Sequence, residues 1–406
     1  FNNTVQLGAV SLPMQTYCYP ESLASFQANT PLVLNALQLF HNLFGEYPFI
    51  KEKYGHEQFG WGGGMEHKTA TFIVSPGESL MAHELAHQWF GDKITCASWV
   101  DIWLNEGFAT HLASIYMEAK YPASTITTRK NEIAYITSQP GGSVKVNDTT
   151  SVGRIFDGRL SYTKGSHLLY MLRWILGDSV FFQAVRQYAK DPKVSYGFAT
   201  TNDLKRNLEQ VSGKDLTGFF KDWYEGHGFP AYTVEWTPLG SSYVKIKINQ
   251  SASYPNTGFF ELPVALNFKN ATQQKTIVLD NTSNGEIFFR NIGFIPDTVL
   301  IDPEYWLITR NNVSRKVPDA TNGQNIVQVF PNPIQSQFYV YLRNFSSANA
   351  TIILYNVAGQ QIHSAKIPIL NGSGFTEITA QYLAPGEYII NVVTDSGLKF
   401  VKKLLK

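Results

Sequence analysis

The chain of 406 residues has few cysteines and few charged side chains. Its two cysteines, Cys18 and Cys96, lack the paired spacing of a cysteine metal site, but they could form one disulfide or stay reduced. Charged residues make up 16% of the chain, below the ~25% typical of soluble domains. Asparagine, serine, threonine and tyrosine fill the gap, a composition that suits a secreted protein better than a cytosolic one.

Long apolar runs and an excess of charge of one sign are also absent. No run reaches the ~20 apolar residues that span a bilayer. The 33 basic and 32 acidic residues give a net charge of +1 without a basic stripe, which argues against nucleic acid as a partner. No signal peptide is present and the chain opens on Phe1, so we expect a mature or trimmed product.

One pattern of histidine and glutamate carries most of the chemical information. His83 and His87 enclose Glu84 in an H-E-x-x-H sequence, within a helix predicted over residues 79–90. Residues four apart share a helix face, so both imidazoles can bind one ion. Glu84, offset by about 100°, can reach a water on that ion without binding the ion itself.

A third ligand must come from elsewhere, because a catalytic zinc takes three protein ligands and leaves the fourth position to water. Glu106 is the candidate, 19 residues after His87 and at the start of a second helix predicted over residues 104–121. We therefore expect one catalytic zinc ion on His83, His87 and Glu106, with Glu84 as the general base. A chance H-E-x-x-H on a solvated helix is the alternative, and the position of Glu106 argues against it.

The sequence around these residues resembles the aminopeptidase N family of gluzincin zinc metallopeptidases. The matching segments are HELAHQWFGD, at residues 83–92, and WLNEGFA, at residues 103–109. The resemblance implies a zinc aminopeptidase that hydrolyses the N-terminal residue from peptides. It assigns the zinc to His83, His87 and Glu106 and the general base to Glu84.

A glycine-rich segment, GGGMEH at residues 62–67, resembles the G-x-M-E-N exopeptidase motif of the same family. The resemblance implies an edge strand beside the substrate, formed by Gly63, Gly64 and Met65, with Glu66 binding the free α-amine. A carboxylate pairs with an ammonium group, and glycine lets the substrate backbone approach closely. His67 departs from the usual asparagine, and a glycine-rich surface loop is the alternative.

The segment SYTKGS, at residues 161–166, precedes an apolar helix predicted over residues 167–176 and resembles the family's Y-x-K-G motif. The resemblance implies that Tyr162 donates a hydrogen bond to the oxyanion of the tetrahedral intermediate. Such a donor is typically worth about 3–4 kcal/mol of the barrier. Ordinary packing of a tyrosine at a helix start is the alternative.

Hydrophobic periodicity divides the chain into modules. Residues 1–230 are mostly helical, with a strand predicted over residues 69–74, and residues 231–312 have the period of two that is typical of strands. Residues 313–325 form a polar linker, and residues 326–406 are again β-structure. Since the family resemblance implies a thermolysin-like catalytic domain, the expected fold is multidomain α+β, with that domain followed by two β-sandwich modules.

Three motifs in the last module, VFPNP at 329–333, LYNVAGQ at 354–360 and LAPGEY at 383–388, precede a lysine-rich end. Together they resemble the C-terminal sorting domain of the type IX secretion system of Bacteroidetes. The resemblance implies a secreted or cell-surface bacterial protein that interacts with the type IX export machinery. A generic sandwich for binding or spacing is the alternative. A disulfide between Cys18 and Cys96 is permissible in such a protein.

We expect the chain to lack the family's N-terminal β-domain and its large C-terminal helical domain. An open cleft would admit longer peptides, so a zinc endopeptidase is a second hypothesis. A non-catalytic cell-surface binding protein is the third. Glu66 favours the aminopeptidase over the endopeptidase, and the complete set of catalytic residues argues against the third.

Overall fold

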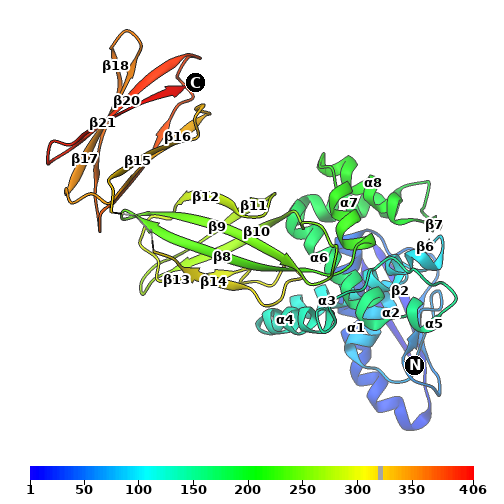
Figure 1. Cartoon of the computed structure of the whole chain (residues 1–406). Coiled ribbons are helices and arrows are strands. Elements are labelled where there is room, and N and C mark those ends of the chain that lie inside the picture. Colours follow the sequence, from blue (N-terminus) through cyan, green and yellow to red (C-terminus); the bar gives the residue numbers. More distant parts are fainter. Residues whose placement is uncertain (319–322) are drawn as a thin grey trace. The chain divides into compact units, whose positions relative to one another are not determined.

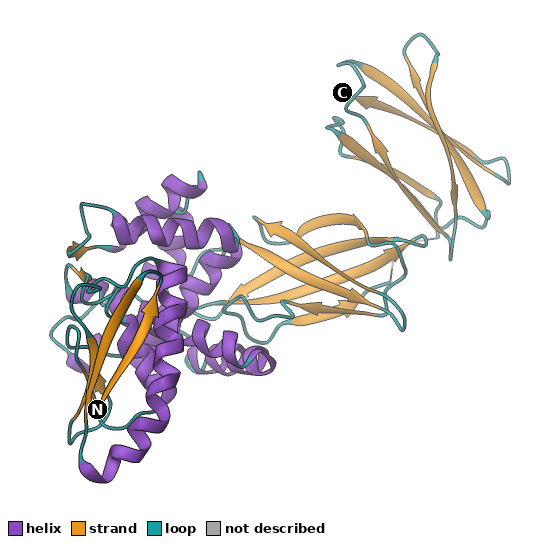
Figure 2. Cartoon of the chain, turned by 180° about the vertical axis from the view of Figure 1, so that it is seen from behind, coloured by secondary structure: helices purple, strands orange, loops and turns teal. Residues whose placement is uncertain are grey.

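The structure, a computed structural model, describes residues 1–318 and 323–406, which form two compact units. Unit 1 consists of Phe1–Tyr232, Gln250–Pro263 and Glu304–Asn311, and the other described residues form unit 2. Figure 1 labels the elements along the chain, and Figure 2 separates helices from strands by colour. No described helix is both long and apolar enough to cross a membrane.

A five-stranded sheet lies in unit 1, in the order β1-β2-β3-β5-β4. β1 and β2 form a hairpin, β3 and β5 continue in parallel, and β4 pairs antiparallel with β5 at the edge. The strand expected over residues 69–74 corresponds to β5, whereas β1 to β3 were not expected from the sequence. The strands of unit 1 are β1 (Asn2–Leu7), β2 (Val10–Tyr17), β3 (Tyr54–Gln58), β4 (Gly64–Met65), β5 (Thr71–Ile73) and the separate parallel pair β6 (Ile94–Cys96) and β7 (Gly197–Ala199).

The helices of unit 1 are arranged around α3, which packs against both α2 and α6. The first turns of α3 are buried on every side, which places the candidate ligand Glu106 in the interior. The helices are α1 (Leu23–Phe44), α2 (Glu78–Ala86), α3 (Trp103–Lys120), α4 (Thr125–Ile136), α5 (Val152–Ile155), α6 (Gly165–Leu176), α7 (Asp178–Lys190), α8 (Thr201–Ser212) and α9 (Thr217–Phe220).

Two helix ends differ from the expected ones, and both lie at the candidate site. α2 ends at Ala86 instead of residue 90, because the chain turns at Gly91, whose φ is 148° and whose N–H donates to the carbonyl of Ile94. The helix expected over residues 167–176 begins earlier, as a π-helical turn, Gly158–Lys164, and continues as α6. Such turns occur frequently at functional sites.

In unit 2, β8 to β14 form two sheets, in the orders β11-β10-β13 and β12-β9-β8-β14. Val244, Ile246 and Ile248 are buried and alternate with half-buried neighbours on β9, as the period of two predicts. The strands are β8 (Pro230–Leu239), β9 (Tyr243–Ala252), β10 (Leu262–Lys269), β11 (Gln274–Asn281), β12 (Glu286–Asn291), β13 (Thr298–Ile301) and β14 (Val313–Lys316).

The predicted linker over residues 313–325 is wrong in its first part. Residues 313–316 form β14, which pairs in parallel with β8 from Val313 opposite Thr233. This partner is remote in sequence, so local composition gave no sign of the pairing. Residues 319–322 of the predicted linker, which include Asp319 and Asn322, lie outside the described residues.

The predicted module 231–312 also does not coincide with one unit. Its segments Gln250–Pro263 and Glu304–Asn311 belong to unit 1. The ring centroids of Phe260 and Trp223 are 4.7 Å apart, and the N–H of Ser253 donates to the carbonyl of Phe229. These contacts with residues 223 and 229 tie the first of the two segments to unit 1.

The last seven strands form two further sheets, in the orders β15-β16-β19 and β18-β17-β20-β21. Their facing sides share one apolar core, which includes Phe338 of β16, Ile352 of β17 and Ile390 of β20, all three expected on strands. This arrangement is a β-sandwich. The strands are β15 (Ile326–Phe330), β16 (Gln337–Arg343), β17 (Asn349–Asn356), β18 (Gln361–Pro368), β19 (Ser373–Thr379), β20 (Glu387–Thr394) and β21 (Lys399–Leu405).

Candidate active site and metal centre

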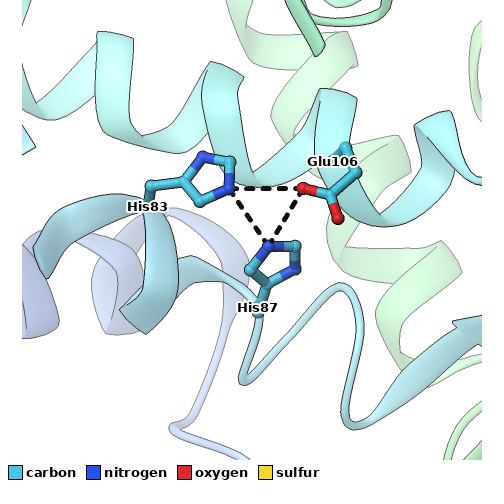
Figure 3. A group of neighbouring side chains, drawn as sticks. All are labelled: His83, His87 and Glu106. Carbon is cyan, nitrogen blue, oxygen red and sulfur yellow. Dashed lines mark hydrogen bonds and ion pairs between the residues drawn. The ribbon is translucent and has the colours of Figure 1, made fainter. Parts of the chain in front are cut away.

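The three expected metal ligands converge between two adjacent helices (Figure 3). His83 lies on the last turn of α2, His87 directly follows that helix, and Glu106 lies on the first turn of α3. The two Nε2 atoms are 3.2 Å apart. Oε2 of Glu106 lies 3.3 Å from Nε2 of His83 and 3.4 Å from Nε2 of His87. The four-residue spacing and the packing of α2 on α3 produce this triangle.

The triangle has the dimensions of a zinc site. Tetrahedral zinc with bonds of about 2.0–2.1 Å holds its ligand atoms about 3.3 Å apart. Nδ1 of His87 lies 3.0 Å from the carbonyl oxygen of Phe90, and a hydrogen bond there directs Nε2 toward the other two ligands. The donor set of two imidazoles and one carboxylate therefore fits zinc.

The electrostatics favour positive charge at the triangle. Burial alone would raise the pKa of Glu106, but the charge of His87 and hydrogen bonds with His83 and His87 lower it to about 2. Burial alone would lower the pKa of His87, yet the carboxylates of Glu106, Glu66 and Glu84 raise it to about 10. For His83 burial prevails and its pKa falls. A divalent cation between these groups would supply the charge that the carboxylates stabilise.

Glu84 lies beside the triangle without belonging to it. Its carboxylate is buried and lies within 4.8 Å of the ligand atoms of Glu66 and His87, which with it form a second group able to hold a cation. Burial raises the pKa of Glu84 to about 8, although His87 opposes the shift. A carboxyl group with such a pKa can accept and return a proton near neutral pH.

The glycine-rich motif forms the sheet edge next to Glu84. Gly64 and Met65 are the two residues of β4, Gly63 precedes them with a φ of 86°, and Glu66 follows directly. A Cβ added to Gly64 would clash with Oε1 of Glu84, so a side chain at this position would displace the carboxylate. Glycine thus allows the strand and Glu84 to occupy neighbouring space.

Tyr162 lies next to the triangle, on the π-helical turn. Its ring stacks on that of His83 with the centroids 5.9 Å apart and an angle of 15° between the planes. Burial raises its pKa, and the neighbouring carboxylate of Glu106 raises it further. The phenol therefore stays protonated at neutral pH and is available as a hydrogen-bond donor.

A close helix crossing brings Tyr162 to the candidate metal ligands. Gly107 of α3 and Gly165 of α6 face each other, and a Cβ on Gly107 would lie 3.0 Å from the carbonyl carbon of Gly165. Gly107 follows Glu106, and Gly165 comes three residues after Tyr162. The absence of side chains at the crossing therefore determines how closely the π-helical turn approaches the triangle.

The predicted site residues line one cavity of about 1300 Å³. They are His83, His87, Glu106, Glu84, Gly63, Gly64, Met65, Glu66 and Tyr162.

Trp99 and Phe156 line the same cavity and were not expected from the sequence. Their rings meet edge to face at 5.9 Å, and both side chains are exposed, at 51% and 41%. Because both rings line the cavity and contact each other, the pair offers an apolar wall to a ligand there. Nothing in the local sequence distinguishes such rings from buried ones.

Both cysteines are free thiols, so the permissible disulfide between Cys18 and Cys96 is not formed. Cys96 is buried on β6 beside the cavity, where its N–H donates to the side-chain oxygen of Asn105. Burial raises the pKa of the Cys96 thiol to about 11, which keeps it protonated.

Comparisons with known proteins agree with both sequence resemblances. Residues 66–223 match the peptidase family M1 domain, and residues 328–406 match the secretion system C-terminal sorting domain. Aminopeptidase N of Lactococcus lactis is 36% identical over 165 residues, which are 39% of this chain and 19% of that protein. Aminopeptidase 2 of Candida albicans is 31% identical over 267 residues, which are 59% of this chain and 28% of that protein.

A solved structure shares the fold. The crystal structure of Legionella pneumophila aminopeptidase A in complex with aspartic acid has a TM-score of 0.66 at 17% identity, covering 78% of this chain and 38% of that one. The matched part of this chain spans less than a third of the length of the two aminopeptidases named above. Within these ranges the expected resemblances are confirmed, and the sorting domain confirms the expectation of a secreted or cell-surface bacterial protein.

Proposed function

We propose that this chain, which joins a peptidase family M1 region to a secretion sorting domain, is a secreted zinc aminopeptidase. The observation that carries the proposal is the convergence, in one cavity, of a zinc-sized ligand triangle, the buried carboxylate of Glu84 and the carboxylate of Glu66. One carboxylate beside the metal suits a base, and a second one suits an ammonium group. The two carboxylates together suit an enzyme that hydrolyses the peptide bond next to a free N-terminus.

The proposal includes a thermolysin-like catalytic region. In such a region a strand-containing lobe and a helical lobe flank the metal, and the presence of the sheet β1–β5 and of the helices that pack on α3 supports this proposal. His83, His87 and Glu106 would hold one catalytic zinc ion. When bound, zinc supplies a Lewis acid that polarises the scissile carbonyl and makes water more acidic.

The side chains then divide the reaction between them. Glu66 pairs with the substrate's α-ammonium, which sets the scissile bond after the first residue. Glu84 takes a proton from the attacking water and returns it to the leaving amine as the C–N bond breaks. The Tyr162 hydroxyl donates to the oxyanion that develops on the carbonyl oxygen. Gly63, Gly64 and Met65 present the strand edge along which the substrate backbone lies.

The sorting domain adds a location to this chemistry. We propose that residues 326–406 direct export through the type IX machinery and that the substrates are peptides outside the cell. The match over residues 328–406 supports this assignment.

The test is hydrolysis of one fluorogenic peptide in two forms, with its N-terminus free or acetylated. Wild-type protein, Glu84→Gln and the exposed-site control Glu52→Gln are compared with and without a zinc chelator. We expect the free form alone to be cleaved, by wild type and Glu52→Gln. Loss of Glu84 should lower kcat by about 10²–10⁴-fold without loss of zinc.

Cleavage of both forms would instead identify the open-cleft endopeptidase, for which the size of the cavity is the specific argument. Lack of cleavage of either form by zinc-loaded protein would overturn the enzymatic proposal in favour of a binding protein.

A further inference from the structure

Three buried or partly buried cations bind one loop behind the π-helical turn. Lys164 donates from Nζ to the carbonyl oxygen of Gly142 at 2.8 Å. Arg159 donates from one nitrogen to the carbonyl oxygens of Ile136 and Gly141, both at 3.1 Å. Arg154 similarly binds the carbonyl oxygens of Ser143 and Lys145, at 2.7 and 3.0 Å. The acceptors are main-chain carbonyl oxygens. The three side chains therefore fix the backbone of the loop relative to the π-helical turn.

Lys164 is the most unusual of the three. Its side chain is 2% exposed. Burial lowers the pKa of its amine to about 7, and the positive charges of Arg159 and Arg154 lower it further. Burying an amine costs free energy unless the amine is hydrogen-bonded, and the Gly142 carbonyl supplies such a bond. Both the charged and the neutral amine can donate to the Gly142 carbonyl, so the contact persists in either form.

The place of Lys164 in the chain suggests what the contact is for. Lys164 is the last residue of the π-helical turn, two residues after Tyr162 and next to Gly165 at the helix crossing. Arg159 is tied to the same loop from the first part of that turn. Tyr162 therefore lies between two anchored points on a backbone that lacks the regular α-helical repeat.

The loop is itself fitted to these anchors. Gly142 has a φ of 108°, and its N–H donates to Nδ1 of His227 at 3.2 Å. A Cβ on Gly142 would lie 2.7 Å from a methyl carbon of Leu160 and 2.8 Å from a guanidinium nitrogen of Arg159. The hydrogen bond and the close packing fix the backbone of Gly142, and so they fix the carbonyl oxygen that accepts from Lys164.

We propose that Lys164 is a positioning residue for Tyr162: its contact with the Gly142 carbonyl holds the π-helical turn where the Tyr162 hydroxyl reaches the reacting carbonyl oxygen. The inference rests on the proposed function, in which Tyr162 stabilises the oxyanion. Lys164 does not line the cavity, so it acts through Tyr162 and not on the substrate.

The first experiment compares three variants in the full chain loaded with zinc. Lys164→Met keeps an unbranched stem but removes the donor, Lys164→Arg keeps a donor, and Lys145→Met is the control because Lys145 forms an exposed ion pair with Glu225. Displacement of a catalytic group by about 1 Å can cost up to about 100-fold in rate, so we expect Lys164→Met to lower kcat about tenfold. KM and zinc content should stay within about twofold of wild type, Lys164→Arg should recover part of the loss, and Lys145→Met should have no effect.

The second experiment is a double-mutant cycle with Tyr162→Phe, which separates positioning from general destabilisation. If Lys164 acts through the Tyr162 hydroxyl, Lys164→Met should not lower kcat further in the Tyr162→Phe background. The same fold loss in both backgrounds would overturn the inference, as would an unchanged kcat for Lys164→Met. If Lys164→Met does not fold, Lys164→Arg takes its place in the cycle.

The two proposals fail differently. An inactive wild-type protein, fully loaded with zinc, contradicts the proposed function. An active wild type with additive losses in the cycle contradicts the role of Lys164 alone.

Discussion

The two sides of the candidate site are built by different means. On the proposed metal side, His83 and Glu106 lie on regular helices and His87 directly follows one. Their separation follows from the four-residue spacing of the histidines and the packing of α2 on α3. On the tyrosine side, Tyr162 lies on a π-helical turn whose position depends on a glycine crossing and on anchored backbone. The geometry of the metal side should therefore be sensitive mainly to which residues occupy the ligand positions. The geometry of the tyrosine side should be sensitive mainly to the conformation of the backbone.

The largest effect is expected from removing a ligand on the metal side. Glu106→Ala should weaken zinc binding by more than about 100-fold, because even residues outside the ligand set change affinity by 10–100-fold. Zinc per protein after dialysis, with residual hydrolysis, measures the loss. Glu66→Gln is the matched control, since Glu66 lies beside the triangle but outside it and its loss should leave zinc in place. Full zinc retention by Glu106→Ala would contradict the assignment of the ligands.

On the tyrosine side, Tyr162→Phe removes one hydroxyl and leaves the ring that stacks on His83. We expect kcat to fall by about 10²–10³-fold, the usual effect of losing one oxyanion donor. Zinc content should not change, which would separate the two sides directly. Steady-state kinetics with metal analysis provides the measurement, and a kcat close to wild type would exclude Tyr162 as the donor.

A smaller effect should follow from opening the helix crossing. In Gly107→Ala, the new methyl group meets the Gly165 backbone at 3.0 Å. Such overpacking lowers the free energy of unfolding by about 1–3 kcal/mol, and the higher helix propensity of alanine offsets up to about 1 kcal/mol of this loss. We expect a lower midpoint of thermal unfolding and a reduced kcat at full zinc occupancy.

Gly153→Ala is the control for this crossing, because its Cβ would meet nothing within 4 Å on α5. It should unfold at the same temperature as wild type or higher. Equal unfolding midpoints for both variants would show that the crossing is not tight.

The smallest effect concerns the aromatic wall of Trp99 and Phe156, which lines the same cavity as both sides. Trp99→Ala should raise KM several-fold for peptides with a large apolar residue beside the scissile bond, and less for peptides with alanine there, since burying part of a ring is worth about 1 kcal/mol or more. Trp61→Ala is the control, because Trp61 is 76% exposed and lies outside the cavity lining. The same KM change for both peptides would contradict a role for Trp99 in side-chain binding.

The contrast between the two sides also explains which features could be predicted from the sequence. The helix positions of His83 and Glu106 could be predicted because a regular helix converts sequence spacing into distance. The four-residue spacing also placed His87 beside His83, although α2 ends one residue before His87. The π-helical turn could not, since nothing local distinguishes it from the start of α6. β14 was missed for a related reason: its partner β8 lies far away in sequence.

The burial of α3 has a consequence for how the protein loses and regains activity. The first turns of α3, with Glu106, are surrounded by α2 and α6, whereas β4 is a two-residue strand at a sheet edge. The free energy of opening that hydrogen exchange reports for each amide ranges from near zero in fraying segments to the full free energy of unfolding in the core, according to burial and hydrogen bonding. The amides of the edge strand should therefore exchange early and those of α3 last. On warming, the proposed substrate-binding edge would loosen while zinc is still held, so inactivation should begin as a reversible event.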